Sequence, residues 1–193
     1  WHQGQLRRRG ATAPGVSYGD IVSGSGGSPV EAMERAVRDP DAAQRYSMHS
    51  FGAVFVEVAV DPDVKTMQVR RGLGVYGAGR IVNPRLAASQ CVGGMVGGIG
   101  MALMEQTVLD PRDGRPVNAH MADYLVPVNL DIASLEAHFV QEHDPHVNAL
   151  GIKGLGEIAL VGMAPAVANA IYHATGTRVR NFPIRIEHLL EEA

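Results

Sequence analysis

Residues 51–60 read FGAVFVEVAV, and this alternation decides the fold that the sequence predicts. Valine occupies every second position from 54 to 60, so one face of an extended strand is apolar, as in a strand with one buried side. The Asp-Pro-Asp sequence at 61–63 predicts a turn, and residues 65–71 predict the strand that returns. The stretch therefore predicts a β-hairpin.

A glycine-rich helix is predicted after the hairpin. Asn83 can cap its N-terminus, and Pro84 suits the first helical position. The run from 86 to 108 then carries glycines at 93, 94, 97, 98 and 100. Each interior glycine costs a helix about 0.5–1 kcal/mol relative to alanine. We therefore expect this helix to pack closely against another backbone or a ligand.

Two more elements complete the predicted α+β fold of β-hairpin, glycine-rich helix, strand and C-terminal helix. Residues 137–141 predict the strand, and residues 158–175 predict the helix, with Gly176 as its stop and a break around Gly162. Residues 1–45 are expected to be weakly ordered and linker-like because they are rich in glycine and serine. The folded part is expected to be 46–193.

Composition argues against several classes of protein. The formal charge of -3 gives no general attraction to nucleic acid or an acidic membrane. Cys91 is the single cysteine, so an intrachain disulfide or a cysteine cluster for a metal is excluded. The uncharged run between Arg85 and Glu105 is near the lower length limit for a membrane helix and contains polar Ser89 and Gln90, so no membrane span is predicted.

The heptad Gly151-Ile152-Lys153-Gly154-Leu155-Gly156-Glu157 is a candidate functional site. Its glycines let a ligand approach the backbone, and the helix that follows offers N–H groups to an anion. Two interpretations of Glu157 are open. It is a general base beside a bound anion, or it only complements the dipole of the helix that follows.

A second candidate site precedes the glycine-rich helix. Arg80, the helix start at Asn83 and the amide of Gln90 would together suit a phosphate or a pterin-like heterocycle, although Arg80 could equally be an ordinary surface residue. Residues 72–77 match a dinucleotide fingerprint, but no helix follows them. The spacing of acids and histidines in 142–146 does not specify a metal site, and no metal ligand is predicted.

Taken together, these motifs resemble the C-terminal end of the molybdenum-binding large subunit of the xanthine dehydrogenase/aldehyde oxidase family, and bacterial periplasmic-type aldehyde oxidoreductases in particular. The resemblance runs from about Tyr46 to Leu190, and residues 1–45 lie outside it. The segments that carry it are 50–53, 77–84, Gln90 with the glycine run, 142–148, 151–157, 173–176 and 178–180.

The resemblance implies an oxidoreductase with a molybdopterin dinucleotide, in its cytosine form, as cofactor. Glu157 corresponds to the family's catalytic base. The implied cofactor contacts are Arg80, Ile81, Val82, Asn83, Pro84, Arg85, Leu86 and Gln90 in one segment, and Lys153, Gly154, Leu155 and Gly156 in the other. Electrons would leave through [2Fe-2S] clusters and FAD on partner subunits, and the substrate would be an aldehyde or an N-heterocycle.

Family large subunits are several times longer than this chain, so two expectations are open: it is one piece of a split or cleaved subunit, whose missing upstream part another chain supplies, or it is a truncated product. The alternative is a non-catalytic remnant or assembly module that binds a partner subunit without cofactor. The first ten residues do not read as a secretory signal, and the expected compartment is the cytoplasm, or the periplasm if another subunit directs export.

Overall fold

The computed structural model describes residues 4–7, 10, 12–29, 31–35 and 39–190. The chain divides into two compact units, Trp1–Val37 and Arg38–Ala193. In the first unit, β1 (Gln5–Leu6) pairs antiparallel with β2 (Val16–Ser17), and α1 (Tyr18–Gly24) begins at a reciprocal capping box between Ser17 and Asp20. The linker-like character of residues 1–45 stays a prediction.

The second unit contains a three-stranded sheet of order β3-β4-β5, and its short first helix is α2 (Ala42–Arg45). Strands β3 (Phe51–Val60) and β4 (Met67–Gly77) form the predicted antiparallel hairpin, with an irregularity between Glu57 and Val58. Strand β5 (Leu135–Phe139) pairs parallel with β4. The connection between them runs through α3 (Pro84–Leu103) and a 3₁₀ turn, η1 (Asn129–Asp131).

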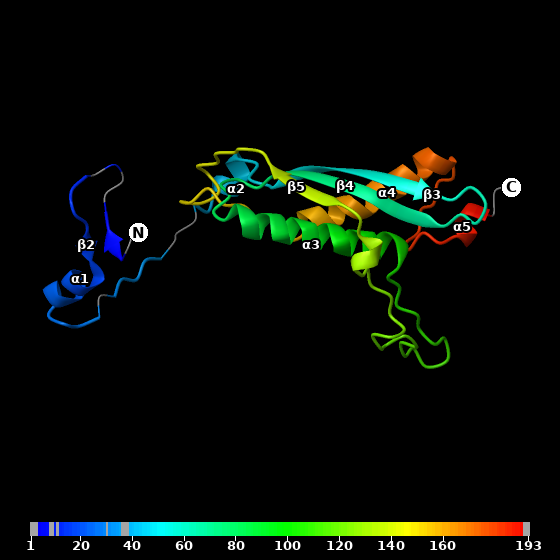
Figure 1. Cartoon of the computed structure of the whole chain (residues 1–193), viewed down its shortest axis with the longest axis horizontal. Coiled ribbons are helices and arrows are strands. Elements are labelled where there is room, and N and C mark those ends of the chain that lie inside the picture. The colour runs from blue at the N-terminus through cyan, green and yellow to red at the C-terminus, as the bar shows by residue number, and fades with distance from the viewer. Residues whose placement is uncertain (1–3, 8–9, 11, 30, 36–38, 191–193) are drawn as a thin grey trace. The chain divides into compact units, whose positions relative to one another are not determined.

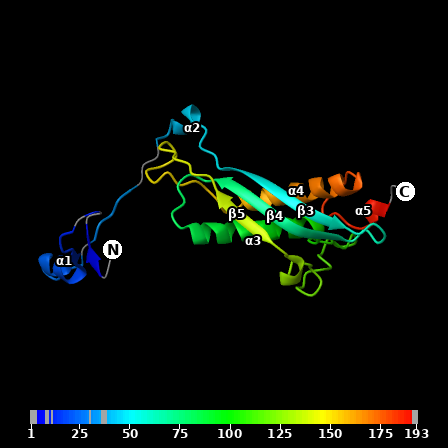
Figure 2. The same ribbon diagram turned by 45° about the horizontal axis from the view of Figure 1, so that its top comes forward.

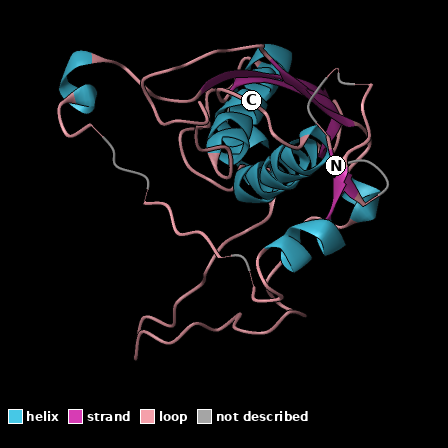
Figure 3. Cartoon of the chain, turned by 90° about the vertical axis from the view of Figure 1, so that its left-hand side faces the viewer, coloured by secondary structure: helices cyan, strands magenta, loops and turns pink. Residues whose placement is uncertain are grey.

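Helices α3 and α4 (Ile158–Thr175) form a layer on one face of this sheet (Figure 1). Helix α4 packs on β3 and α3 packs on β5, and the two helices pack on each other, as the turned views also show (Figures 2 and 3). The chain ends in α5 (Glu187–Leu190). The predicted α+β class and the predicted order of elements are confirmed.

The core lies between the sheet and the two helices. Helices α3 and α4 are each long and apolar enough to cross a membrane by length and composition alone, a test that core helices also pass. Here their inner faces supply most of the core. The largest fully buried side chains are those of Tyr76, Met95, Ile99, Met163, Ile171, Ile184, Val167 and Cys91.

The glycines of α3 are explained by the approach of α4. A Cβ at Gly98 would lie 2.5 Å from the Met163 Cβ and 2.9 Å from the Leu160 carbonyl oxygen, and one at Gly94 would lie 3.0 Å from the Ala159 Cβ. Gly94 meets Ala159 and Gly98 meets Met163, so the residue numbers of both helices increase in the same direction and the helices run parallel. The expected compensation by close backbone packing is therefore present.

Three local predictions need correction. Strand β4 continues to Gly77, so the dinucleotide-like motif lies inside the strand, where the ring of Tyr76 covers the positions of Gly52 and Gly74. The expected break near Gly162 is wrong, because α4 continues through Pro165 and loses only the one hydrogen bond that proline cannot donate. Strand β5 also begins two residues earlier than predicted.

Candidate functional site

The two predicted site segments are joined by a short backbone bridge. Gly79 pairs antiparallel with Ile152, the Arg80 N–H donates to the Gly151 carbonyl at 2.7 Å, and the Lys153 N–H donates to the Ala78 carbonyl at 3.1 Å. The end of β4 thereby meets the start of the heptad, although more than 70 residues separate them in sequence. The structure thus brings together the two candidate sites.

The first segment lies at the exposed start of α3. The Asn83 side chain accepts a hydrogen bond from the Leu86 N–H at 3.1 Å, and Pro84 occupies the first turn, as predicted. Both arginines of this segment, Arg80 and Arg85, are exposed. All members of the segment except the half-buried Ile81 are therefore accessible to a ligand.

The second segment changes character along its length. Gly151 is buried and Leu155 packs against the core, whereas Gly154 and Gly156 are exposed and have nothing within 4 Å of the place where a Cβ would stand. The heptad is thus anchored at its start and open to solvent near its end. This openness leaves room for a ligand to reach the backbone.

Glu157 immediately precedes α4 and is exposed. Its side chain makes no capping hydrogen bond to the helix, and its carboxylate makes no hydrogen bond or ion pair with the residues that the structure describes. Because the Glu157 carboxylate neither caps the helix nor pairs with a cation among the described residues, its structural role there is limited to its negative charge at the helix start. It is available to a ligand or a substrate.

Gln90 lies on the same side of the domain. Gly94 of α3 lies beside Leu160, which is close to the start of α4. Gln90 comes one helical turn before Gly94, so it lies past the N-terminal end of α4. Its side chain is exposed. The parallel helices therefore present both of their N-termini, with Gln90 and Glu157, at one end of the domain.

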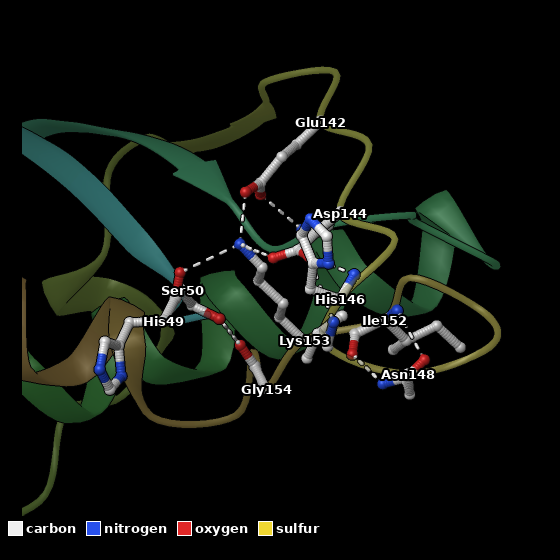
Figure 4. Close-up of polar contacts among 11 residues, drawn as sticks. His49, Ser50, Glu142, Asp144, His146, Asn148, Ile152, Lys153 and Gly154 are labelled. Carbon is white, nitrogen blue, oxygen red and sulfur yellow. Dashed lines mark hydrogen bonds and ion pairs between the residues drawn. The ribbon is translucent and has the colours of Figure 1, made fainter. Parts of the chain in front are cut away.

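Lys153 differs from the rest of the predicted set, because its side chain is only 4% exposed. Figure 4 shows its ammonium among protein oxygens: it binds Glu142 Oε1, lies 3.1 Å from Asp144 Oδ2 and donates to the His49 carbonyl at 3.3 Å. The second oxygen of Glu142 accepts the Gly79 N–H at 2.8 Å. Lys153 is thus the centre of a buried polar cluster.

Charge and hydrogen bonding in this cluster shift the ionisation of its members. The hydrogen bond from Lys153 lowers the pKa of Glu142, and the Glu142 carboxylate raises the pKa of Lys153. Hydrogen bonds from the His146 N–H and then from Lys153 lower the pKa of Asp144. All three groups are therefore held in their charged forms at neutral pH.

Sequence reasoning did not identify Glu142 and Asp144 as partners of Lys153. The spacing of the acids and histidines in 142–146 is only a weak signal for a metal site. Among the residues that the structure describes, no three His, Cys, Asp or Glu side chains are grouped so that they could hold a metal ion. Asp144 instead accepts the N–H groups of His146 and Val147 at 2.9 and 3.2 Å in a turn. The one signal in the sequence for this ion-pair cluster is that Lys153 follows Glu142 and Asp144 within 11 residues.

Comparisons with known proteins identify the family of this chain. A family described as the molybdopterin cofactor-binding domain matches residues 1–133. The aldehyde oxidoreductase molybdenum-binding subunit PaoC of Escherichia coli is 43% identical over 159 residues, which are 82% of this chain and 22% of that protein. The putative xanthine dehydrogenase molybdenum-binding subunit XdhA of the same species is 38% identical over 143 residues, 74% of this chain and 19% of the relative.

Solved structures show the same fold. The aldehyde oxidoreductase from Desulfovibrio desulfuricans matches 74% of this chain and 15% of its own with a TM-score of 0.65 and 29% identity. Quinoline 2-oxidoreductase from Pseudomonas putida 86 matches 69% of this chain and 17% of its own with a TM-score of 0.62 and 28% identity. This chain spans about a fifth of the length of the curated relatives it matches.

The family match extends beyond the resemblance that the sequence showed. The family match begins at residue 1, so it includes residues 1–45, where the sequence showed no resemblance. It ends before the heptad, but an aligned stretch of 82% of the chain necessarily includes both 80–90 and 151–157. This chain is therefore a member of the molybdopterin cofactor-binding domain family and a relative of the molybdenum-binding subunits of aldehyde oxidoreductases and xanthine dehydrogenases.

Proposed function

We propose that this chain is the segment of a molybdenum-dependent aldehyde oxidoreductase that carries the catalytic base, Glu157, and part of the site for a molybdopterin cytosine dinucleotide. The observation that carries the proposal is the position of Glu157. It is an exposed carboxylate without a partner among the described residues, at a helix start beside two open glycines. The similarity to PaoC, whose name describes an aldehyde oxidoreductase, supports the choice of substrate class.

The residues at this end of the domain fit an anionic dinucleotide. Two helix N-termini offer N–H groups, and Arg80 and Arg85 add exposed positive charge. The amide of Gln90 can both donate to and accept from a heterocycle, and the open backbone at Gly154 and Gly156 admits close approach. The chain would hold the cofactor with these groups, while further contacts come from the longer subunit.

The chain's own chemical contribution is proton transfer. When bound, the molybdenum cofactor supplies the two-electron oxidation of the substrate. The Glu157 carboxylate would accept a proton at one of its oxygens during that reaction, and its position immediately before α4 leaves it exposed for this role.

The assembly that we propose has three further components. FAD-binding and [2Fe-2S] subunits would carry the electrons away, as the description of relatives as subunits of complexes suggests. A further chain, or a further part of this one, would supply the remainder of the large subunit. The compartment, cytoplasm or periplasm, stays a prediction.

The proposal is tested by Glu157→Gln in the assembled enzyme. General-base catalysis contributes roughly 10²–10⁴-fold, so turnover of an aldehyde substrate should fall by about that factor while molybdenum and released CMP stay stoichiometric. Glu187→Gln, at another exposed helix start, is the matched control and should leave turnover unchanged. Turnover of Glu157→Gln within about tenfold of the unmutated enzyme would exclude Glu157 as the base.

Metal and nucleotide analysis separates this function from the alternative. Purified native protein with one molybdenum and one CMP for each copy of the subunit supports the oxidoreductase. A protein that contains neither and still co-purifies with a longer chain would instead be an assembly module.

A further inference from the structure

We propose that Lys153 is a positioning residue rather than a cofactor-binding one: its buried ammonium fixes the Arg80 turn to the segment that leads into Glu157. This inference rests on the proposed function for its effect on turnover. Its structural content, that Lys153 acts through Glu142 on Gly79, does not depend on that function.

The ammonium has no donor left for a ligand. A lysine ammonium has three N–H donors, and Lys153 has three protein oxygens around it, from Glu142, Asp144 and the His49 carbonyl. Its side chain is 4% exposed, so a ligand at the open end of the heptad cannot approach it without displacing one of them. The direct contact that the resemblance implies is therefore not available to the side chain.

The cluster joins four segments that are distant in sequence. His49 lies two residues before β3, Gly79 follows β4, Glu142 follows β5, and Lys153 precedes α4. The Ser50 hydroxyl also donates to the Gly154 carbonyl. The three strand ends are thus joined to the segment before α4 at Lys153, which Figure 4 shows together with Glu142, Asp144 and His49. Arg80 directly follows Gly79, and Glu157 comes four residues after Lys153.

The positive charge of Lys153 keeps the carboxylates of Glu142 and Asp144 in place. Glu142 and Asp144 both lie against the same cation, and without it two carboxylates would share a poorly hydrated site. Breaking a partly buried ion pair by removing one partner leaves the remaining charge uncompensated. Glu142 would then turn toward solvent and release the Gly79 N–H, which immediately precedes Arg80.

The test compares Lys153→Met, Glu142→Gln and the double variant in the assembled enzyme. Lys65→Met, a substitution of the chain's other lysine in the turn at the opposite end of the β-hairpin, is the matched control. Amide hydrogen exchange, CMP content, molybdenum content, kcat and KM are measured for each. Exchange and CMP content report on the cluster even if Glu157 is not the base.

We expect amide exchange to increase by about tenfold or more at residues 79–80 and 151–157 in Lys153→Met and in Glu142→Gln, and not in the strands. Turnover should fall by about 10–100-fold, as for other residues that orient a site, with KM nearly unchanged and CMP retained. The double variant should be no worse than the more impaired single variant, because both changes break one network.

Three results would overturn the inference. Loss of CMP in Lys153→Met but not in Glu142→Gln would mean that Lys153 binds the cofactor. Additive losses in the double variant would mean that the two residues act separately. A lower melting temperature with unchanged local exchange and kcat would mean a merely structural role. If Lys153→Met does not fold, Glu142→Gln still tests the inference, because unchanged exchange at 79–80 and 151–157 together with unchanged kcat in that variant would overturn it. Glu157→Gln separately decides the proposed function.

Discussion

Gly79 packs directly against the Gly151 carbonyl beside the backbone bridge to Ile152, and no side chain fits at Gly79. Both have positive φ, 66° and 68°, and a Cβ at Gly79 would overlap the Gly151 carbonyl oxygen that accepts the Arg80 N–H. The bridge therefore needs glycine at position 79 for two reasons: the positive φ and the lack of room for a Cβ. This contact connects the two segments of the candidate site.

Gly79→Ala should consequently impair cofactor retention as well as stability. The methyl group must push the Gly151 carbonyl away, and we expect a loss of more than about 2 kcal/mol in the free energy of unfolding and a fall in bound CMP. Gly114→Ala is the control, because Gly114 has φ of 73° but nothing within 4 Å, so only the conformational cost of about 1 kcal/mol applies. Equal losses in the two variants would contradict the steric argument.

The helix interface gives a second prediction, from two glycines of the same helix. Gly98→Ala should destabilise the protein by about 1–3 kcal/mol, because its methyl group would press on Met163 and on the Leu160 carbonyl. Gly93→Ala should stabilise it by up to about 1 kcal/mol, because Gly93 is exposed and nothing lies within 4 Å. Chemical denaturation of both variants checks the prediction, and a gain at both positions would contradict the packing.

The polar cluster around Lys153 predicts how stability depends on pH. The pKa values of Glu142 and Asp144 are lowered by folding, so their contribution is present above the ordinary carboxyl pKa and is lost as pH falls below about 4. The pKa of Lys153 is raised, so its contribution is present at neutral pH and is lost as pH rises beyond about 10.4. The cluster therefore stabilises the fold between these limits.

Glu142→Gln checks this pH dependence. The melting temperature of the variant should fall less steeply than that of the unmutated protein between neutral pH and about pH 3, because one of the carboxylates that must be protonated is gone. Glu187→Gln, which does not involve a partner of Lys153, serves as the control. Parallel curves for Glu142→Gln and the unmutated protein would show that the cluster does not contribute to acid stability.

The buried hydroxyl of Tyr76 predicts a substitution that stabilises the protein. Its side chain is fully buried on the inner face of β4, and its hydroxyl has no hydrogen-bond partner in the described part of the chain. Burial raises the pKa of this phenol to about 12. Tyr76→Phe keeps the ring that covers Gly74 and removes the unsatisfied hydroxyl, so we expect a gain of about 1 kcal/mol in unfolding free energy. A loss of similar size would reveal a partner for the hydroxyl.

The elements that were predicted well have strong local signals. The alternating valines of β3, the Asn83-Pro84 start of α3 and the Gly176 stop of α4 each act within a few residues. Gly176 has φ of 80°, the left-handed conformation that ends many helices. Such signals need no knowledge of the rest of the chain.

The features that were missed depend on tertiary contacts. The glycines of 72–77 weaken a strand by themselves, and only the ring of Tyr76 and the pairing with β3 and β5 show why β4 continues through them. Lys153 has the sequence context of an exposed cation beside glycines, and its burial follows from two loops that reach it from elsewhere. The sequence alone could not show that Lys153 is buried among Glu142, Asp144 and the His49 carbonyl.

One contact described above bears on the order in which the parts of the domain fold during synthesis. His49 and Ser50 reach Lys153 and Gly154 across 104 residues, so the contact order at this end of the domain is high. The hairpin and α3 can form while the rest of the chain is still on the ribosome, but their polar strand ends remain unpaired until the segment at 151–157 emerges. We therefore expect this end to be the last part of the domain to fold, and the cofactor to be inserted into a completed chain.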